Sequence, residues 1–527
     1  MRSTHVLAPV LVIALLAPPA SAQPADQVDP PPAVAGWSVD RVAPGISVFS
    51  GTLGEPSPGA HWTVIVRVPT LPGDGNPDPD LPTADLGSRS AADQLAERLR
   101  AAGQSPQVDR VDWPDFADTP RGQLGWRVRV GTFPDRTAAQ ARASELTTAG
   151  FTAAPDWTGQ DGDSTAGPWK LHVAVIDPRR FTGRVAASYG QAVSGRETTS
   201  AMAVAQHALL GTNGGFFVID PAQGIAGEPA GIGLHDGQLQ SEAVNGRPAL
   251  VLAEGGRAPR ITPLRTAASV RTRTAVRELD GVNRVPGLVP GCGGVGGDRP
   301  TELPLLDVAC TDDSELVLMT PQLGGTAPRG AGLEAVLDEQ NVVTALRPRG
   351  GPVPTRGSVL QAVGNAADWL RTNAQPGTAL RLDEQVYDAD GRSVHFGPHD
   401  DVINGGPGLV SDGRIRVDAV GSGIVHAADP SFVYSWGVRR NPRTAAGIDG
   451  SGRLLLVTVD GRQPGVSEGF SIVEAARFLR SLGAVDALNL DGGGSTTMAV
   501  RGKAVNVPSD ATGERPVGDA VLVVPKR

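Results

Sequence analysis

The sequence has few cysteines, few aromatic residues and no excess of positive charge. Two cysteines in 527 residues exclude a disulfide-dense small scaffold and a four-cysteine zinc site. Aromatic residues make up only 4% of the chain, against 68 glycines and 45 prolines, which favours many turns and short strands over long helical bundles. The formal net charge of −9 argues against nucleic-acid binding through overall charge.

Several familiar catalytic motifs are also missing. The chain has no His-Glu-x-x-His motif, so the usual signature of zinc peptidases is absent. Residues 291–296 match a dinucleotide fingerprint but have neither the preceding strand nor the following helix. Gly and Pro separate His395 from His399, which excludes helical presentation of the pair, and residues 460–462 are typical of a β-turn. We therefore expect no cofactor and no metal ion.

The N-terminus indicates the compartment. Arg2 precedes an apolar run from Val6 to Ala17 and the small residues of 20–22, the layout of a secretory signal peptide over 1–22. The run is shorter than the ~20 residues that span a bilayer, and no later stretch approaches that length. We expect a secreted, extracellular chain without a membrane span, in which Cys292 and Cys310 form a disulfide; two buried thiols are the alternative.

The length suggests about two to four domains. Residues 23–59, rich in Pro, Gly, Ala and Asp, predict a largely unstructured linker. Over 60–157 a strand–helix–strand pattern occurs twice, which predicts a small four-stranded antiparallel sheet backed by two helices. Its expected strands are His61–Val68, Pro106–Val111, Trp126–Val130 and Phe151–Ala154. The first helix is capped by Ser88 or Ser90 and ends at Gly103, and the second ends at Gly150.

This repeat resembles the SPOR domain, a βαββαβ module that binds peptidoglycan glycan strands. The likeness is best from Trp126 to Phe133 and over the following stretch from Arg136 to Gly150. The resemblance implies peptidoglycan as a partner and attachment to the cell wall; a small α+β spacer is the plainer alternative.

A second linker is expected over 156–167, followed by one large α+β domain with mixed sheets over 168–525. Its short apolar runs are separated by glycines, as strands between turns would be. A helix stands out between Ser471 and Gly483, with Ser471 and Glu474 as a capping box, and 486–490 follows as a buried strand.

The motif that carries most chemistry follows that strand. Asp491 leads into Gly492, Gly493, Gly494 and Ser495. Glycines let backbone N–H groups approach a ligand, and successive N–H groups form an anion-binding nest. A tight hairpin turn is the structural alternative.

Two more polar stretches follow apolar segments. Residues 211–217 contain Asn213 followed by two glycines and two phenylalanines, which suits sugar or phosphate contacts or a plain Asn-Gly hairpin. Residues 441–449 contain Arg443, whose guanidinium can bind phosphate through two N–H groups. A glycine-rich loop at 404–410 is interpreted as architectural.

Together these segments resemble the phosphodiester glycosidase family, from about Pro168 to Val524. The landmarks are 213–217, 406–410, 441–447 and 491–495. The resemblance implies hydrolysis of a sugar-1-phosphodiester such as an N-acetylglucosamine 1-phosphodiester. Carried over by position, it implies catalytic roles for Asp491, Arg443 and Asn213, and substrate binding by Gly214, Gly215, Thr444, Gly492, Gly493, Gly494 and Ser495.

The residue chemistry points the same way. A sugar-1-phosphodiester departs as a phosphomonoester, whose second pKa is ~6, so it needs charge stabilisation more than protonation. Arg443 and the amides of residues 492–494 suit that task, and Asp491 could stabilise the sugar cation, attack it or activate water. We expect a hydrolase acting on a cell-wall or exopolysaccharide glycan and tethered by the SPOR-like domain; a non-catalytic glycan-binding protein is the alternative.

Overall fold

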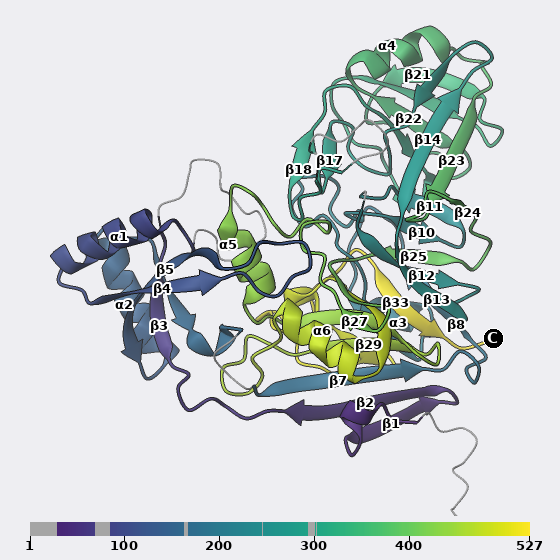
Figure 1. Ribbon diagram of the computed structural model, residues 1–527. Coiled ribbons are helices and arrows are strands. Elements are labelled where there is room, and N and C mark those ends of the chain that lie inside the picture. The colour runs from purple at the N-terminus through teal and green to yellow at the C-terminus, as the bar shows by residue number, and fades with distance from the viewer. Residues whose placement is uncertain are drawn as a thin grey trace, which may run out of the picture.

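A computed structural model describes residues 29–68, 85–162, 167–244, 246–293, 301 and 303–526. The expected signal peptide lies outside the described residues. The fold is α+β, as predicted, with several sheets and few helices. Figure 1 shows a small domain on one side, a large body in the middle and a lobe above it. Among the described helices, none is both long and apolar enough to cross a lipid bilayer.

The body is built on an eight-stranded sheet in which all neighbours are antiparallel. Its residues alternate between two buried faces: in the strand Trp169–Ile176, Leu171 and Val173 face one core cluster while Ala174 and Ile176 face another. In spatial order the strands are β1 (Ser38–Ala43), β2 (Ile46–Leu53), β7 (Trp169–Ile176), β29 (Leu454–Val459), β28 (Arg443–Asp449), β30 (Ala484–Asn489), β26 (Gly408–Ser411) and β27 (Arg414–Ile415).

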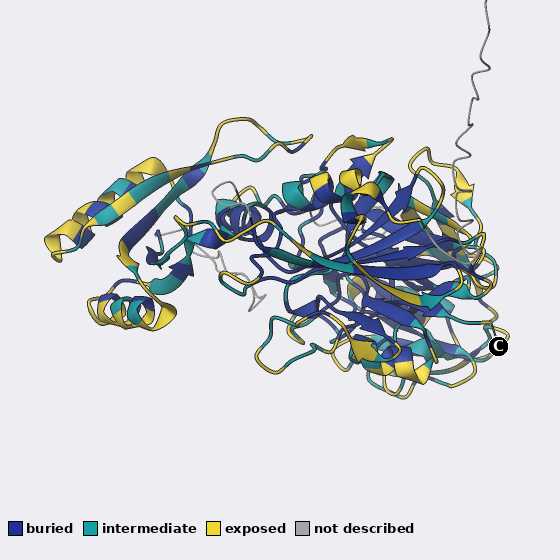
Figure 2. Cartoon of the chain, turned by 90° about the horizontal axis from the view of Figure 1, so that it is seen from below, coloured by how far each residue is buried: buried dark blue, intermediate teal, exposed yellow. Residues whose placement is uncertain are grey.

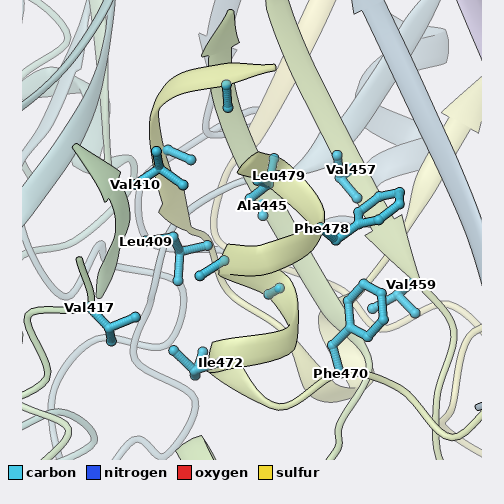
Figure 3. Close-up of a cluster of buried hydrophobic side chains, with 14 of the residues drawn as sticks. Leu409, Val410, Val417, Ala445, Val457, Val459, Phe470, Ile472, Phe478 and Leu479 are labelled. Atoms are coloured by element: carbon cyan, nitrogen blue, oxygen red, sulfur yellow. The ribbon is translucent and has the colours of Figure 1, made fainter. Parts of the chain in front are cut away.

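Helix α6 (Ile472–Ser481) covers one face of this sheet. It begins as predicted: the side chain of Ser471 accepts from the amide of Glu474, and the carboxylate of Glu474 accepts from the amide of Ser471. Figure 3 shows Ile472, Phe478 and Leu479 of the helix packed with side chains of the strands beneath. The buried strands appear dark blue in Figure 2.

Two further sheets cover the other face of the large sheet. One sheet contributes Val185, Leu210 and Val521 to the shared core, and the other contributes Leu250 and Leu252. The first has the order β32 (Lys503–Ala504), β31 (Met498–Val500), β9 (Leu210–Asn213), β33 (Ala520–Val524), β8 (Arg184–Ser188), beside α3 (Thr199–Ala205). The second has the order β11 (Gln238–Ser241), β10 (Gly233–His235), β25 (Asp401–Asn404), β12 (Pro248–Ala253), β13 (Ala258–Pro263).

The upper lobe in Figure 1 holds the remaining sheets of this region and one helix. It includes one parallel pair, β16 with β19. One sheet has the order β15 (Val276–Glu278), β14 (Arg265–Arg271), β23 (Arg381–Tyr387), β24 (Ser393–Val394). A second sheet has the order β16 (Gly281–Val282), β19 (Leu316–Met319), β22 (Ser358–Ala362), β20 (Leu333–Leu337), β21 (Val343–Pro348). The lobe also contains the strand pair β17 (Leu288–Pro290) and β18 (Ala309–Thr311) and the helix α4 (Gly364–Asn373).

The prediction of an unstructured linker over 23–59 is wrong from residue 32 onward. A short helical turn at Pro32–Val34 precedes β1 and β2, and β2 pairs with β7 along its whole length. The turn between β1 and β2 is Pro44-Gly45, where Gly45 has φ +78° and a Cβ would meet the backbone of Phe181. The two strands carry apolar residues on both sides of this turn, among them Val42, Ile46 and Val48, but the overall composition of the segment hides them.

The predicted four-stranded small domain is confirmed. Its sheet has the order β4 (Pro106–Asp112), β5 (Gln123–Phe133), β3 (Trp62–Val66), β6 (Ala153–Trp157), all antiparallel, with helices α1 (Arg89–Ala101) and α2 (Arg136–Thr148) on one face. Ser88 and Asp135 cap the two helices. The proline-rich stretch 69–82 lies outside the described residues. Because β2 precedes this domain and β7 follows it, the domain is an insertion between two paired strands of the large sheet.

The small domain is docked firmly on the body. The loop between β4 and β5 places Phe116 in the same core cluster as α6, and the carboxylate of Asp118 accepts from the amides of residues 419–421. The sheet face opposite the helices is covered too, since Arg129 and Arg439 both pair with buried Asp156. The linker predicted over 156–167 is therefore wrong at its start, where residues 156–162 pack in this interface.

Candidate functional site

A polar pocket opens where β28 and β30 lie side by side. Because the two strands are antiparallel, the beginning of β28 at Arg443 adjoins the end of β30, and Asp491 follows directly. The amide of Leu490 donates to the carbonyl of Thr444. The pocket is lined by Phe216, Phe217, Ile219, Asp307, Trp436, Asn441, Arg443, Arg462, Asp491, Gly492, Gly493 and Arg515.

Asn213 lies beneath this pocket and is fully buried at the end of β9. Its Nδ2 donates to the carbonyl of Asp491 at 2.7 Å, and its Oδ1 accepts from Thr444 Oγ1 at 2.6 Å and from the amide of Thr497 at 3.1 Å. The structure thus brings the three predicted stretches together. Asn213 and Thr444 hold Asp491 in place but do not line the pocket.

Gly214 and Gly215 serve close packing at this point. The carbonyl of Gly214 accepts from the amide of Asp491, while a Cβ on Gly214 would lie 2.3 Å from Asp519 Oδ1. A Cβ on Gly215 would lie 2.5 Å from the carbonyl oxygen of Asn404. Neither glycine lines the pocket, so both act through the backbone that supports it.

The glycine turn differs from the predicted anion nest. The amide of Gly492 donates to Asp491 Oδ1 at 2.9 Å, and the amide of Gly493 donates to the carbonyl of Pro442 at 2.9 Å. These N–H groups are therefore already used inside the protein. A Cβ on Gly494 would collide with the Arg515 side chain, so this glycine makes room for an arginine, and Ser495 is buried behind it.

Arg443 is held rigidly. Its Nε donates to the carbonyl of Phe470 at 3.1 Å, its Nη2 donates to the carbonyl of Trp436, and the guanidinium lies 4.8 Å from the centroid of the Trp436 ring. Burial, together with the neighbouring charge of Arg462, lowers the pKa of Arg443 to about 9, so it stays protonated at neutral pH. The Nε edge is occupied, which excludes a two-pronged phosphate contact through Nε and Nη2.

Three charged pocket residues were not among the predicted site residues. Arg462 donates to Asn441 Oδ1 at 3.0 Å, and Arg515 donates to both carboxylate oxygens of Asp510. Asp307 comes from the segment closed by the predicted disulfide, which the structure confirms between Cys292 and Cys310. Of these three residues, only Arg462 lies in a stretch that the sequence analysis mentions, the predicted β-turn at 460–462. The pocket wall therefore combines three arginines with two aspartates, and Asp510 behind the wall neutralises Arg515.

One cluster of metal-ligand type lies elsewhere. Among the described residues, ligand atoms of His235, Asp236 and Asp401 lie within 4.8 Å of one another. Asp401 accepts from the amides of Ala187 and Asp236, and Asp236 pairs with Arg184. These contacts account for the cluster as an internal network, and none of these side chains lines the candidate pocket.

Comparison with known proteins identifies both domains. The phosphodiester glycosidase family matches residues 331–524, and the SPOR domain matches residues 83–155. The solved structure of a candidate exported protein from Burkholderia pseudomallei has a TM-score of 0.79 and 31% identity, with 93% of this chain and 96% of that chain covered. The chain belongs to the phosphodiester glycosidase family and carries a SPOR domain, and the Burkholderia protein is a relative that shares its whole architecture.

Named enzymes match over a shorter stretch. The mouse N-acetylglucosamine-1-phosphodiester alpha-N-acetylglucosaminidase is 29% identical over 164 residues, which cover 30% of this chain and 30% of that enzyme. A hypothetical protein from Synechocystis, with a TM-score of 0.52 and 17% identity over 90% of this chain and 77% of its own, shares the fold. The chain thus spans about a third of the length of the curated relative it matches.

Proposed function

We propose that this protein hydrolyses a sugar-1-phosphodiester linkage, of the N-acetylglucosamine 1-phosphodiester kind, in a cell-wall or exopolysaccharide glycan. The observation that carries the proposal is that Arg443, Arg462 and Asp491 line one pocket. The name of the mouse relative supports the linkage.

The pocket suits such a reaction in its distribution of charge. The arginines stabilise the phosphomonoester as it departs, because its charge rises from about −1 to between −1.5 and −2. Asp491 provides the negative charge that an oxocarbenium-like sugar requires. Its main chain is fixed by the carbonyl of Gly214 and the side chain of Asn213, so the carboxylate is positioned before substrate arrives.

The test is release of reducing sugar from an activated N-acetylglucosamine 1-phosphodiester. The wild type should turn it over, and Asp491→Asn should lose at least ~100-fold in kcat. The matched control is Asp368→Asn on α4, an exposed aspartate paired only with Arg371 among the described residues, which should behave as wild type. Absence of turnover with intact glycan binding would favour the non-catalytic alternative.

We also propose that the protein is exported and that its SPOR domain binds peptidoglycan, which tethers the enzyme to the cell wall. The description of the Burkholderia relative as a candidate exported protein supports export. Because Arg129 and Asp156, on the sheet face opposite the helices, pack against Arg439 of the body, a glycan cannot use that part of the face. Co-sedimentation of the full chain with peptidoglycan stripped of stem peptides tests this part; failure to sediment contradicts it.

A further inference from the structure

A second hollow, here called the side chamber, adjoins the candidate active-site pocket. The two share Phe217, Ile219 and Asp307 as walls. The side chamber has a volume of about 40 Å³, room for about three water molecules, since one water needs ~10–15 Å³ by this measure. It therefore has room for a small group that projects from a ligand in the adjoining pocket.

Arg247 forms a polar wall of the side chamber and is fully buried. Its Nε donates to the carbonyl of Ser422 at 3.1 Å and its Nη1 to the carbonyl of Ala230 at 2.6 Å. Its Nη2 is buried and has no hydrogen-bond partner among the residues that the structure describes. A buried charged donor without an acceptor is costly, so an acceptor supplied by a ligand would be bound favourably.

The other polar groups of the side chamber restrict what that ligand group can be. The carboxylate of Asp307 lies close enough to raise the pKa of Arg247, and Asp220 adds a second carboxylate to the wall of the side chamber. Two carboxylates repel an anionic group, and a carbonyl cannot donate to them. A hydroxyl group accepts from a guanidinium and donates to a carboxylate, so it satisfies both.

We propose that the side chamber binds a neutral, hydroxyl-bearing group of the substrate whose phosphodiester occupies the adjoining pocket, with the guanidinium of Arg247 donating to the hydroxyl oxygen. This inference rests on the proposed function and adds a determinant of specificity to it. The group lies on either the sugar or the alcohol side of the phosphate, and the experiment separates these two cases.

The test measures the affinity of Asp491→Asn, by calorimetry, for three diesters. The parent is the glycerol diester of N-acetylglucosamine 1-phosphate; one analogue lacks the sugar 6-hydroxyl, and the other carries propyl in place of glycerol. A hydrogen bond to a charged group corresponds to about 10-fold to 100-fold in affinity, so one of the two analogues should bind that much more weakly.

A variant that fills the side chamber provides the control. Ala309 lines the side chamber but not the adjoining pocket, so Ala309→Leu in the same background should abolish the difference between parent and analogue. The exposed Ala101→Leu on α1 should preserve it. Arg247→Lys, checked for folding by its melting temperature, should also abolish it.

Equal binding of all three diesters overturns the side-chamber proposal, as does a preference that survives Ala309→Leu. Failure of all three to bind overturns it as well. Turnover of the parent by the wild type, measured in parallel, tests the proposed function separately: an enzyme that hydrolyses the diester without hydroxyl preference loses only this inference.

Discussion

Replacing Asn213 with alanine should destabilise the protein and misplace Asp491. Asn213 is fully buried and makes three hydrogen bonds through its side chain, to the carbonyl of Asp491, the hydroxyl of Thr444 and the amide of Thr497. A buried group left without its partner costs about 1–3 kcal/mol. The hydroxyl of Thr444 can rotate toward another acceptor, so we expect a loss of about 3–5 kcal/mol in the free energy of unfolding.

Denaturant unfolding followed by tryptophan fluorescence measures this loss. The midpoint should fall while the slope stays unchanged, because the surface exposed on unfolding is the same. The control is Asn365→Ala at an exposed position of α4, which should shift the free energy of unfolding by less than about 0.5 kcal/mol.

Kinetics distinguish positioning from direct contact. Because Asn213 does not line the pocket, the folded variant should lose kcat through a displaced Asp491 while KM changes little. Stability within 1 kcal/mol of wild type, combined with a large rise in KM, would mean that Asn213 contacts substrate and that its buried position has been misjudged.

Three other variants test further parts of the structure. Arg443→Lys should lower turnover and also destabilise the fold, because the carbonyls of Phe470 and Trp436 lose their donors; equal melting temperatures would contradict this. Cys292→Ala/Cys310→Ala should lose about 3 kcal/mol of stability, and reductant should bring wild type to the same melting temperature. Burial raises the pKa of Asp519 from 3.8 to about 7, so its contribution to stability is present below pH 4 and is lost as the pH rises through 7. Asp519→Asn, which keeps the acceptor for the amide of Gly215, should therefore be more stable than wild type at pH 8, by at most about 4 kcal/mol, and the difference should vanish near pH 4. A constant difference across this range would refute the assignment.

Elements with a strong local pattern could be predicted from the sequence. Helix α6 was found because its apolar spacing and its capping box lie within ten consecutive residues or next to them. Strands β1 and β2 were missed because Pro and Gly dominate the composition around them. The pairing of β2 with β7 is also non-local, because the whole inserted SPOR domain lies between these two strands in the sequence.

Residues of the candidate site could be predicted from the sequence where they lie in a recognisable motif. Arg443 and Asp491 lie in glycine-flanked stretches that the family resemblance singled out, and both line the pocket. Asp307 and Arg515 stand alone in the sequence, so only the tertiary fold shows that they belong there. The predicted anion nest differs for a related reason: glycine gives backbone amides access to a ligand, but the carboxylate of Asp491 and the carbonyl of Pro442 already accept from the amides of Gly492 and Gly493.

The charge of the pocket bears on how the proposed reaction would be catalysed. Interactions accelerate a reaction only when they strengthen on the way to the transition state. The diester carries about one negative charge, and the departing monoester gains more as the glycosidic bond breaks. Arg443 and Arg462 lie on the pocket wall, so the field of these two cations favours the leaving group over the intact substrate. The rigid contacts of Arg443 matter for the same reason, because a cation already held in place does not have to reorganise as that charge develops.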